Sequence, residues 1–126
     1  MSVLDASVLI AYFGDDVHTP RASALLAKSE GSRALHPVTL AEVLTGPARI
    51  GAEEDVRHVI DAIGVDVISP DDDEPILAAR IRAATGLKLP DCYPVAAAIT
   101  RQSALATFDA QLARVARGLG VEVVGG

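Results

Sequence analysis

Cysteine, aromatic residues and long apolar runs are all scarce in this chain of 126 residues. Cys92 is the only cysteine, which excludes an intrachain disulfide and the cysteine-rich spacings of zinc sites. Aromatic side chains make up 3% of the sequence, so a surface that grips single strands by stacking is not expected. No apolar run approaches the roughly 18 residues of a membrane span, and the first residues lack a signal peptide's basic start. We therefore expect a soluble, cytoplasmic protein whose fold rests on packing alone.

The net charge of −6 argues weakly against a nucleic-acid binder, because such domains usually carry a basic footprint. The charge is unevenly distributed, however. Residues 80 to 117 contain six basic and two acidic side chains, whereas residues 1 to 79 contain five basic and fourteen acidic ones. If a phosphate backbone is bound, the C-terminal half is the expected face, with Lys88 and Arg114 as the expected phosphate contacts.

The length and the hydrophobic content of 50% predict a single domain, residues 1–126, with one packed core. Five short apolar segments are expected strands: residues 2–4, 34–36, 65–68, 105–107 and 121–124. Segments of helical periodicity lie between them. Strands that alternate with helices need crossover connections, which predicts an α/β fold with a parallel sheet covered on both faces.

Helix-capping signals set the expected helix boundaries. Asp5 or Ser7 caps a helix to about residue 13, and Thr19 caps a helix that runs to about Glu30. Residues 39–42 spell a capping box for a helix that ends near residues 46–47. Further helices are expected at residues 53–63, after the acidic run 71–74 as far as residue 85, from Asp91 to residue 101, and from Asp109 to residue 117.

Four acids stand at or near these strand-to-helix corners: Asp5, Glu42, Asp91 and Asp109. Each has a plain explanation as a helix cap, but capping does not exclude a second role. In an open parallel sheet, ligands bind at the carboxyl ends of the strands where strand order reverses. If the first and fourth strands are neighbours there, Asp5 and Asp109 face one crevice, and Glu42 follows the second strand on the same edge.

Four carboxylates in one crevice raise each other's pKa, and a divalent cation would resolve the conflict. Oxygen ligands without histidine or cysteine favour Mg²⁺ or Mn²⁺ over zinc. Such an ion suits phosphodiester hydrolysis, because it polarises a phosphoryl oxygen and helps to deprotonate water. The sequence therefore predicts a metal site built from these acids.

Three other features have simpler interpretations. Cys92 is expected to be a small core residue, although it lies beside Asp91. His36 ends a strand and could approach the crevice, but no histidine has a partner for a zinc or nucleophilic site. The run of acids at residues 71–74 is expected to be a solvated helix start and not a second metal site.

Four segments together resemble the PIN-domain ribonucleases: Val3-Leu4-Asp5-Ala6-Ser7, Thr39-Leu40-Ala41-Glu42-Val43, Leu89-Pro90-Asp91 followed by Ala96-Ala97-Ala98, and Ala106-Thr107-Phe108-Asp109. Within that superfamily, the length and the approach Gly86-Leu87-Lys88-Leu89-Pro90-Asp91 are similar to the VapC toxins of toxin–antitoxin pairs. The resemblance covers nearly the whole chain. One departure is Cys92-Tyr93-Pro94, where family members often have small residues after the third acid.

The resemblance implies a three-layer α/β/α fold with a parallel sheet in the order 3-2-1-4-5. It implies a Mg²⁺- or Mn²⁺-dependent endoribonuclease whose acidic site is formed by Asp5, Glu42, Asp91 and Asp109. Ser7 and Thr107 match hydroxyl residues that would hydrogen-bond the acids or a water at the metal. The resemblance also implies a homodimer, and a cognate VapB-like antitoxin whose C-terminal segment blocks the site.

The sequence bears on three alternative functions. A metal- and RNA-binding PIN module with little or no turnover would keep the same pocket. A phosphoacceptor signalling domain needs an acidic pair after the first strand and a lysine after the last, and an Asp-x-Asp phosphatase needs an acid where Ser7 stands. The sequence therefore disfavours the last two.

Overall fold

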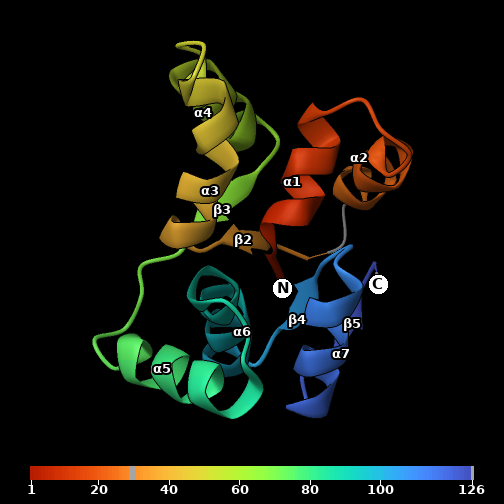
Figure 1. Ribbon diagram of the computed structural model, residues 1–126. Coiled ribbons are helices and arrows are strands. Elements are labelled where there is room, and N and C mark those ends of the chain that lie inside the picture. The colour runs from red at the N-terminus through yellow and green to blue at the C-terminus, as the bar shows by residue number, and fades with distance from the viewer. Residues whose placement is uncertain (29–30, 126) are drawn as a thin grey trace.

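The computed structural model describes residues 1–28 and 31–125, which form a five-stranded sheet with helices on both faces (Figure 1). The strands are β1 (Ser2–Leu4), β2 (Arg33–Leu35), β3 (Val65–Val67), β4 (Ala104–Ala106) and β5 (Val123–Val124). Every pairing is parallel and the order is β3-β2-β1-β4-β5. The predicted sheet order is confirmed, and β1 and β4 are neighbours at the point where strand order reverses.

The helices form two layers. One face of the sheet is covered by α1 (Ala6–Phe13), α2 (Thr19–Ala27), α3 (Pro37–Ala48) and α4 (Glu53–Ala62). The other face is covered by α5 (Glu74–Thr85), α6 (Leu89–Arg101) and α7 (Ala110–Gly118), as Figure 1 shows. The expected three-layer α/β/α architecture is confirmed. Among the described helices, none has the length and apolar content to cross a bilayer.

Two buried clusters hold the layers together. Val3 and Leu105 point to the α5–α7 side, whereas Leu4 and Ala106 point to the α1–α4 side. This alternation follows from the two-residue period of a strand, and burial on both faces explains why adjacent residues such as Val3 and Leu4 are both apolar. Helix α6 is the most deeply packed, and its small residues 96–98 are all buried.

Two helix starts differ from the sequence expectations. The capping box at residues 39–42 is wrong, because α3 begins at Pro37 and His36 is its N-cap, with imidazole Nδ1 accepting the N–H of Val38 at 3.0 Å. Thr39 therefore lies inside the helix and is buried. The expectation that Asp91 caps α6 is also wrong, because α6 begins at Leu89 with Lys88 at the N-cap. Asp91 instead lies in the first turn, where acids are favoured by the helix dipole.

Helix α2 also differs in its details. Its N-cap is His18, while the Thr19 hydroxyl donates to the carbonyl of Ala11 at 2.8 Å and so links α2 to α1. The helix is described as far as Ala27, and its expected end at Glu30 lies outside the described residues. The short strands, by contrast, begin within two residues of their expected starts.

Candidate active site

Asp5 stands at the carboxyl end of β1 and is the N-cap of α1, as the sequence predicts. Its residue is 5% exposed, and its backbone N–H donates to the carbonyl of Ala106 on β4 at 2.9 Å. Carboxylate oxygen Oδ2 accepts three hydrogen bonds, from Ser7 Oγ at 2.8 Å, Thr107 Oγ1 at 2.9 Å and the Ser7 N–H at 3.3 Å. Within the described chain, no hydrogen bond ends on Oδ1. The carboxylate is thus fixed by one oxygen and has the other available to a ligand.

The two hydroxyls connect the ends of β1 and β4. Ser7 Oγ donates to Asp5 and accepts the N–H of Phe108 at 3.0 Å. Thr107 Oγ1 donates to Asp5 and accepts the N–H of Asp109 at 3.0 Å. Each hydroxyl therefore uses its single hydrogen on Asp5 and its lone pairs on the β4–α7 turn. This network sets the position of Asp109 relative to Asp5.

Asp109 is the N-cap of α7, also as predicted. Its Oδ1 accepts the N–H of Leu112 at 3.0 Å, and the residue is exposed to solvent. Capping occupies one carboxylate oxygen only. Asp109 therefore combines a structural role in α7 with a place at the open edge of the sheet.

Glu42 on α3 and Asp91 on α6 complete the acidic cluster. Both are half-buried, and α3 packs against α6. Burial raises the pKa of Glu42 above its ordinary value, and the charges of Asp91 and Asp5 raise it further. Burial likewise raises the pKa of Asp91, assisted by the charges of Asp5 and Asp109 and opposed by Lys88. The structure thus brings all four predicted acids close enough for their charges to interact.

The chemistry of this cluster fits a hard divalent cation. The donors are carboxylate oxygens, which suit Mg²⁺ or Mn²⁺. Burial and then neighbouring negative charge raise the pKa values of Glu42 and Asp91, and a cation would neutralise that charge. In residues 1–28 and 31–125, no three His, Cys, Asp or Glu side chains are drawn together tightly enough to enclose an ion. Mg²⁺ in proteins commonly keeps several waters and is held by one or two carboxylates.

The expected phosphate contacts lie on the two helices that carry Asp91 and Asp109. Lys88 is exposed at the N-cap of α6, and its charge lowers the pKa of Asp91, which places it beside the acids. Arg114 is exposed on α7, the helix capped by Asp109. Lys88 is therefore the better placed of the two to meet a phosphate at the cluster.

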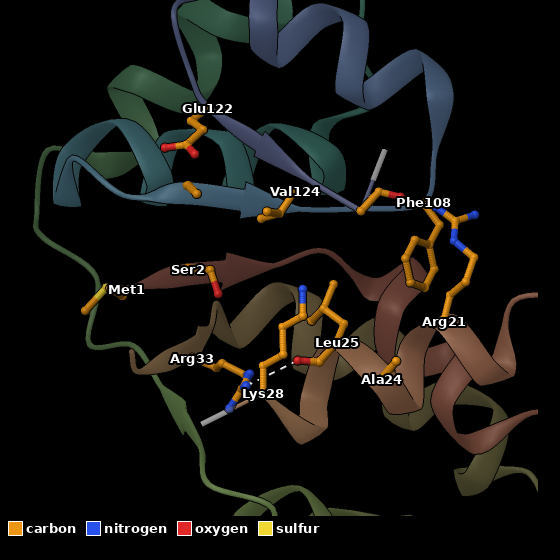
Figure 2. A pocket seen from close by; sticks show the side chains of 12 residues that line it. Met1, Ser2, Arg21, Ala24, Leu25, Lys28, Arg33, Phe108, Glu122 and Val124 are labelled. Carbon is orange, nitrogen blue, oxygen red and sulfur yellow. Dashed lines mark hydrogen bonds between the residues drawn. The ribbon is translucent and has the colours of Figure 1, made fainter. Parts of the chain in front are cut away.

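A separate cleft of about 540 Å³ lies between α2 and the edge formed by β4 and β5 (Figure 2). Arg21, Lys28 and Arg33 line it together with Glu122. At one end the Arg21 guanidinium lies over the Phe108 ring, 4.6 Å from its centroid. The acidic cluster does not line this cleft. This cleft is not predicted from the sequence, because its cations are scattered through a half of the chain that is acidic as a whole.

Sequence reasoning also missed a buried pair between His36 and Glu74. Imidazole Nε2 hydrogen-bonds Glu74 Oε1, and both residues are buried. The interpretation of residues 71–74 as a solvated helix start is correct for the three exposed aspartates and wrong for Glu74. The position of His36 at a strand end before proline was the only local signal. Cys92 is buried in the core, as expected.

Similarity to known proteins agrees with this geometry. A toxin–antitoxin complex from Klebsiella pneumoniae is similar at 22% identity and a TM-score of 0.80, covering 98% of this chain and 96% of that chain. The sarcin–ricin-loop-cleaving toxin VapC20 from Mycobacterium tuberculosis is similar at 16% identity and a TM-score of 0.77, covering 90% and 94%. FitAcB from Neisseria gonorrhoeae is similar at 22% identity and a TM-score of 0.73, covering 99% and 97%.

At these identities the likeness concerns the fold, and no curated protein matches the chain. The family itself is shown by sequence, because the model of the PIN domain matches residues 2–118. Those residues include all four acids, both hydroxyl residues and the first four strands. The resemblance inferred from the sequence motifs is confirmed, and the chain belongs to the PIN-domain family.

Proposed function

We propose that this PIN domain is a Mg²⁺- or Mn²⁺-dependent endoribonuclease that acts as the toxin of a toxin–antitoxin pair. The proposal rests on the arrangement of side chains around Asp5. Asp5 is held through Oδ2 by Ser7 and Thr107 at the strand-order reversal, where its charge acts on Glu42 and Asp91 and where Asp109 acts on Asp91. The names of the similar structures, which include toxin–antitoxin complexes and an RNA-cleaving toxin, support this class of activity.

The four acids would form the metal site. Asp5, Asp91, Asp109 and Glu42 would hold the cation, with Asp5 as the central ligand because its orientation is fixed. When bound, the cation supplies polarisation of a phosphoryl oxygen and a more acidic water.

RNA would reach this edge of the sheet through its phosphates. Lys88 stands beside Asp91, and Arg114 projects from the helix that Asp109 caps. Both would offset the repulsion between the acidic cluster and a polyanion. RNA as the substrate class rests on the similarity to the RNA-cleaving toxin named above.

A cognate VapB-like antitoxin is the proposed protein partner. A groove between α1 and α3 is lined by Ile10, Phe13 and Pro47 and reaches Glu42. Ile10 is 52% exposed there and, with Phe13 and Pro47, gives the groove an apolar lining beside Glu42. An antitoxin segment in this groove would cover apolar surface and close the approach to the acids.

Homodimerisation is the other proposed association. Large apolar side chains outside that groove are exposed, among them Val17, Ile50 and Ile76. Burying such side chains against a second copy of the chain would remove apolar surface from water. Light scattering at high concentration should show a dimer, and a monomer would count against it.

The activity is tested by incubating the pure chain with an RNA pool and Mg²⁺ or Mn²⁺. Cleavage should require the ion, stop on addition of EDTA, and be lost in Asp5→Asn. Asp72→Asn, which removes an exposed carboxylate before α5, is the matched control and should cleave as the wild type does. Cleavage that persists in Asp5→Asn would refute the assignment. Metal binding without cleavage of any RNA would favour the binding module instead.

A further inference from the structure

His36 lies where three helices meet, directly after the carboxyl end of β2. It follows β2, is 2% exposed, and its imidazole packs on Tyr93 of α6 with ring centroids 4.8 Å apart. Nε2 hydrogen-bonds Glu74 at the first position of α5, which is 5% exposed. Nδ1 accepts the N–H of Val38 in the first turn of α3 at 3.0 Å. One side chain therefore contacts α3, α5 and α6.

The hydrogen bonds define how this imidazole is protonated. Nδ1 faces a backbone N–H, so it must act as an acceptor and carry no hydrogen. The ring proton is then on Nε2, which donates to the Glu74 carboxylate. Rotating the ring would break both bonds at once. The orientation of His36 is therefore fixed from two sides.

Capping α3 does not by itself explain a buried histidine. Serine, threonine, asparagine or aspartate can all satisfy the first N–H groups of a helix. What the imidazole adds is a second nitrogen that reaches across the sheet edge to Glu74. A buried carboxylate is costly unless it is hydrogen-bonded, so His36 and Glu74 satisfy each other. The pair links the start of α3 to the start of α5.

These contacts lead to three of the four acids. Leu35 of β2 is in register with Leu4 of β1, so His36 leaves the sheet at the level where Asp5 leaves it. Helix α3, which His36 caps, carries Glu42. Helix α6, which His36 contacts through Tyr93, carries Asp91 two residues earlier. The tyrosine that departs from the family pattern after the third acid is thus a packing partner of His36.

We infer that His36 is a positioning residue of the acidic site: with Glu74 and Tyr93 it fixes α3 and α6 at the end of β1, and so sets where Glu42 and Asp91 stand relative to Asp5. The inference deepens the proposed function and rests on it. Both imidazole nitrogens of His36 are already engaged, by Val38 and by Glu74, so neither is free to ligate an ion. His36 acts through the two helices that it holds.

The test distinguishes the role of Nδ1, which caps α3, from that of Nε2, which binds Glu74. His36→Asn keeps a short acceptor for the Val38 N–H but cannot reach Glu74, whereas Glu74→Gln keeps an acceptor for Nε2. Titration calorimetry with Mn²⁺ and with Mg²⁺ gives the affinity of each folded variant. Metal binding should weaken about tenfold in His36→Asn, as for residues that orient metal ligands, and stay within about threefold of wild type in Glu74→Gln. His58→Ala, which removes an exposed imidazole from α4, is the matched control and should bind as the wild type does.

A loss of folded protein would not explain weaker metal binding in His36→Asn, because all affinities are measured where circular dichroism shows the folded state. A folded His36→Asn with wild-type metal affinity overturns the inference. If His36→Asn does not fold, the imidazole ¹⁵N spectrum of the wild type decides: a proton on Nε2 is expected, and a proton on Nδ1 overturns the arrangement. A wild type that binds neither ion refutes the proposed function and this inference together. A wild type that binds metal and cleaves RNA, with His36→Asn unchanged, refutes the inference alone.

Discussion

Thr107 Oγ1 donates to Asp5 Oδ2 at 2.9 Å although the two residues are 102 positions apart in the chain. The contact exists because β1 and β4 pair in parallel with Leu4 opposite Ala106, so that Asp5 and Thr107 leave the sheet side by side. Neither residue alone distinguishes a helix cap from a site. Their hydrogen bond joins two strand ends into one rigid corner on which the remaining acids converge.

Replacing the buried threonine should therefore impair the site more than the fold. Thr107→Val keeps the side-chain shape but removes the donor to Asp5 and the acceptor for the Asp109 N–H. We expect RNA cleavage to fall about ten- to a hundredfold, as for other residues that orient metal ligands, with a loss of about 1–2 kcal/mol in unfolding free energy. Cleavage assays and urea denaturation measure the two effects. Thr100→Val, at an exposed position of α6, should change neither.

Removing the charge of Asp91 should abolish activity while stabilising the metal-free chain. Its raised pKa means that the folded state disfavours the charged carboxylate, so the charge costs stability at neutral pH. Asp91→Asn removes that cost, and the melting temperature without metal should rise. Cleavage should fall at least a hundredfold. A lower melting temperature for Asp91→Asn would show that the carboxylate stabilises the fold and would contradict the expected sign.

The contribution of Glu42 and Asp91 to stability should fall as pH rises. Their ordinary values are 4.5 and 3.8 and both pKa values are raised in the folded chain. Between the unfolded and folded pKa values the native state binds more protons, so the unfolding free energy decreases with increasing pH. Denaturation of the wild type and of the double variant Glu42→Gln/Asp91→Asn from pH 3.5 upward gives the contribution of these two carboxylates as the difference in unfolding free energy. Saturating Mg²⁺ should reverse this decrease in unfolding free energy in the wild type only, because the charged carboxylates then bind the ion.

Lys88 should contribute to RNA affinity and not to the chemical step. Lys88→Ala removes an exposed cation beside Asp91, so KM should rise several-fold with little change in kcat. The slope of log affinity against log salt should become shallower by about one unit, the expectation for one lost phosphate contact. Arg80→Ala, an exposed cation on α5, is the control. An unchanged KM and an unchanged salt slope in Lys88→Ala would remove it from the RNA interface.

Cys92 should be unreactive in the folded chain. Burial raises the pKa of its thiol, and Sγ lies 3.4 Å from the Lys88 carbonyl. Thiolate is the reactive form, so iodoacetamide at pH 8 should modify the native chain slowly and the urea-unfolded chain quickly. Mass spectrometry follows the reaction. Rapid native labelling would indicate that α6 opens beside Asp91.

The parts of the fold that sequence predicts well are governed by local chemistry. Asp5 and Asp109 cap their helices as expected, because a carboxylate next to a helix start bonds to N–H groups two or three residues away. The strand order followed from the resemblance to the PIN family. The position of Glu42 after the second strand was also correct, although the capping box that suggested it does not form.

What the sequence could not predict depends on distant contacts. The run of acids at residues 71–74 looks uniformly solvated, and only the folded chain brings the last of them against His36. Asp91 was expected at a cap, but Leu89 and Pro90 continue the helix backward by two residues. Proline is accepted at a helix start, so no local signal distinguishes the two starts. The role of Tyr93 was not predictable either, because it depends on a contact with His36, which is distant in the sequence.

The three donors that occupy Oδ2 of Asp5 bear on which ion the site accepts. A carboxylate with one oxygen engaged in this way can offer a single oxygen to a metal and cannot chelate it with both. Ca²⁺ commonly takes six to eight ligands, often from carboxylates that bind through both oxygens, whereas Mg²⁺ accepts six at shorter distances and keeps water. Ser7 and Thr107 would therefore do more than hold Asp5 in place: they would make it a monodentate ligand, which suits a small cation that keeps part of its water.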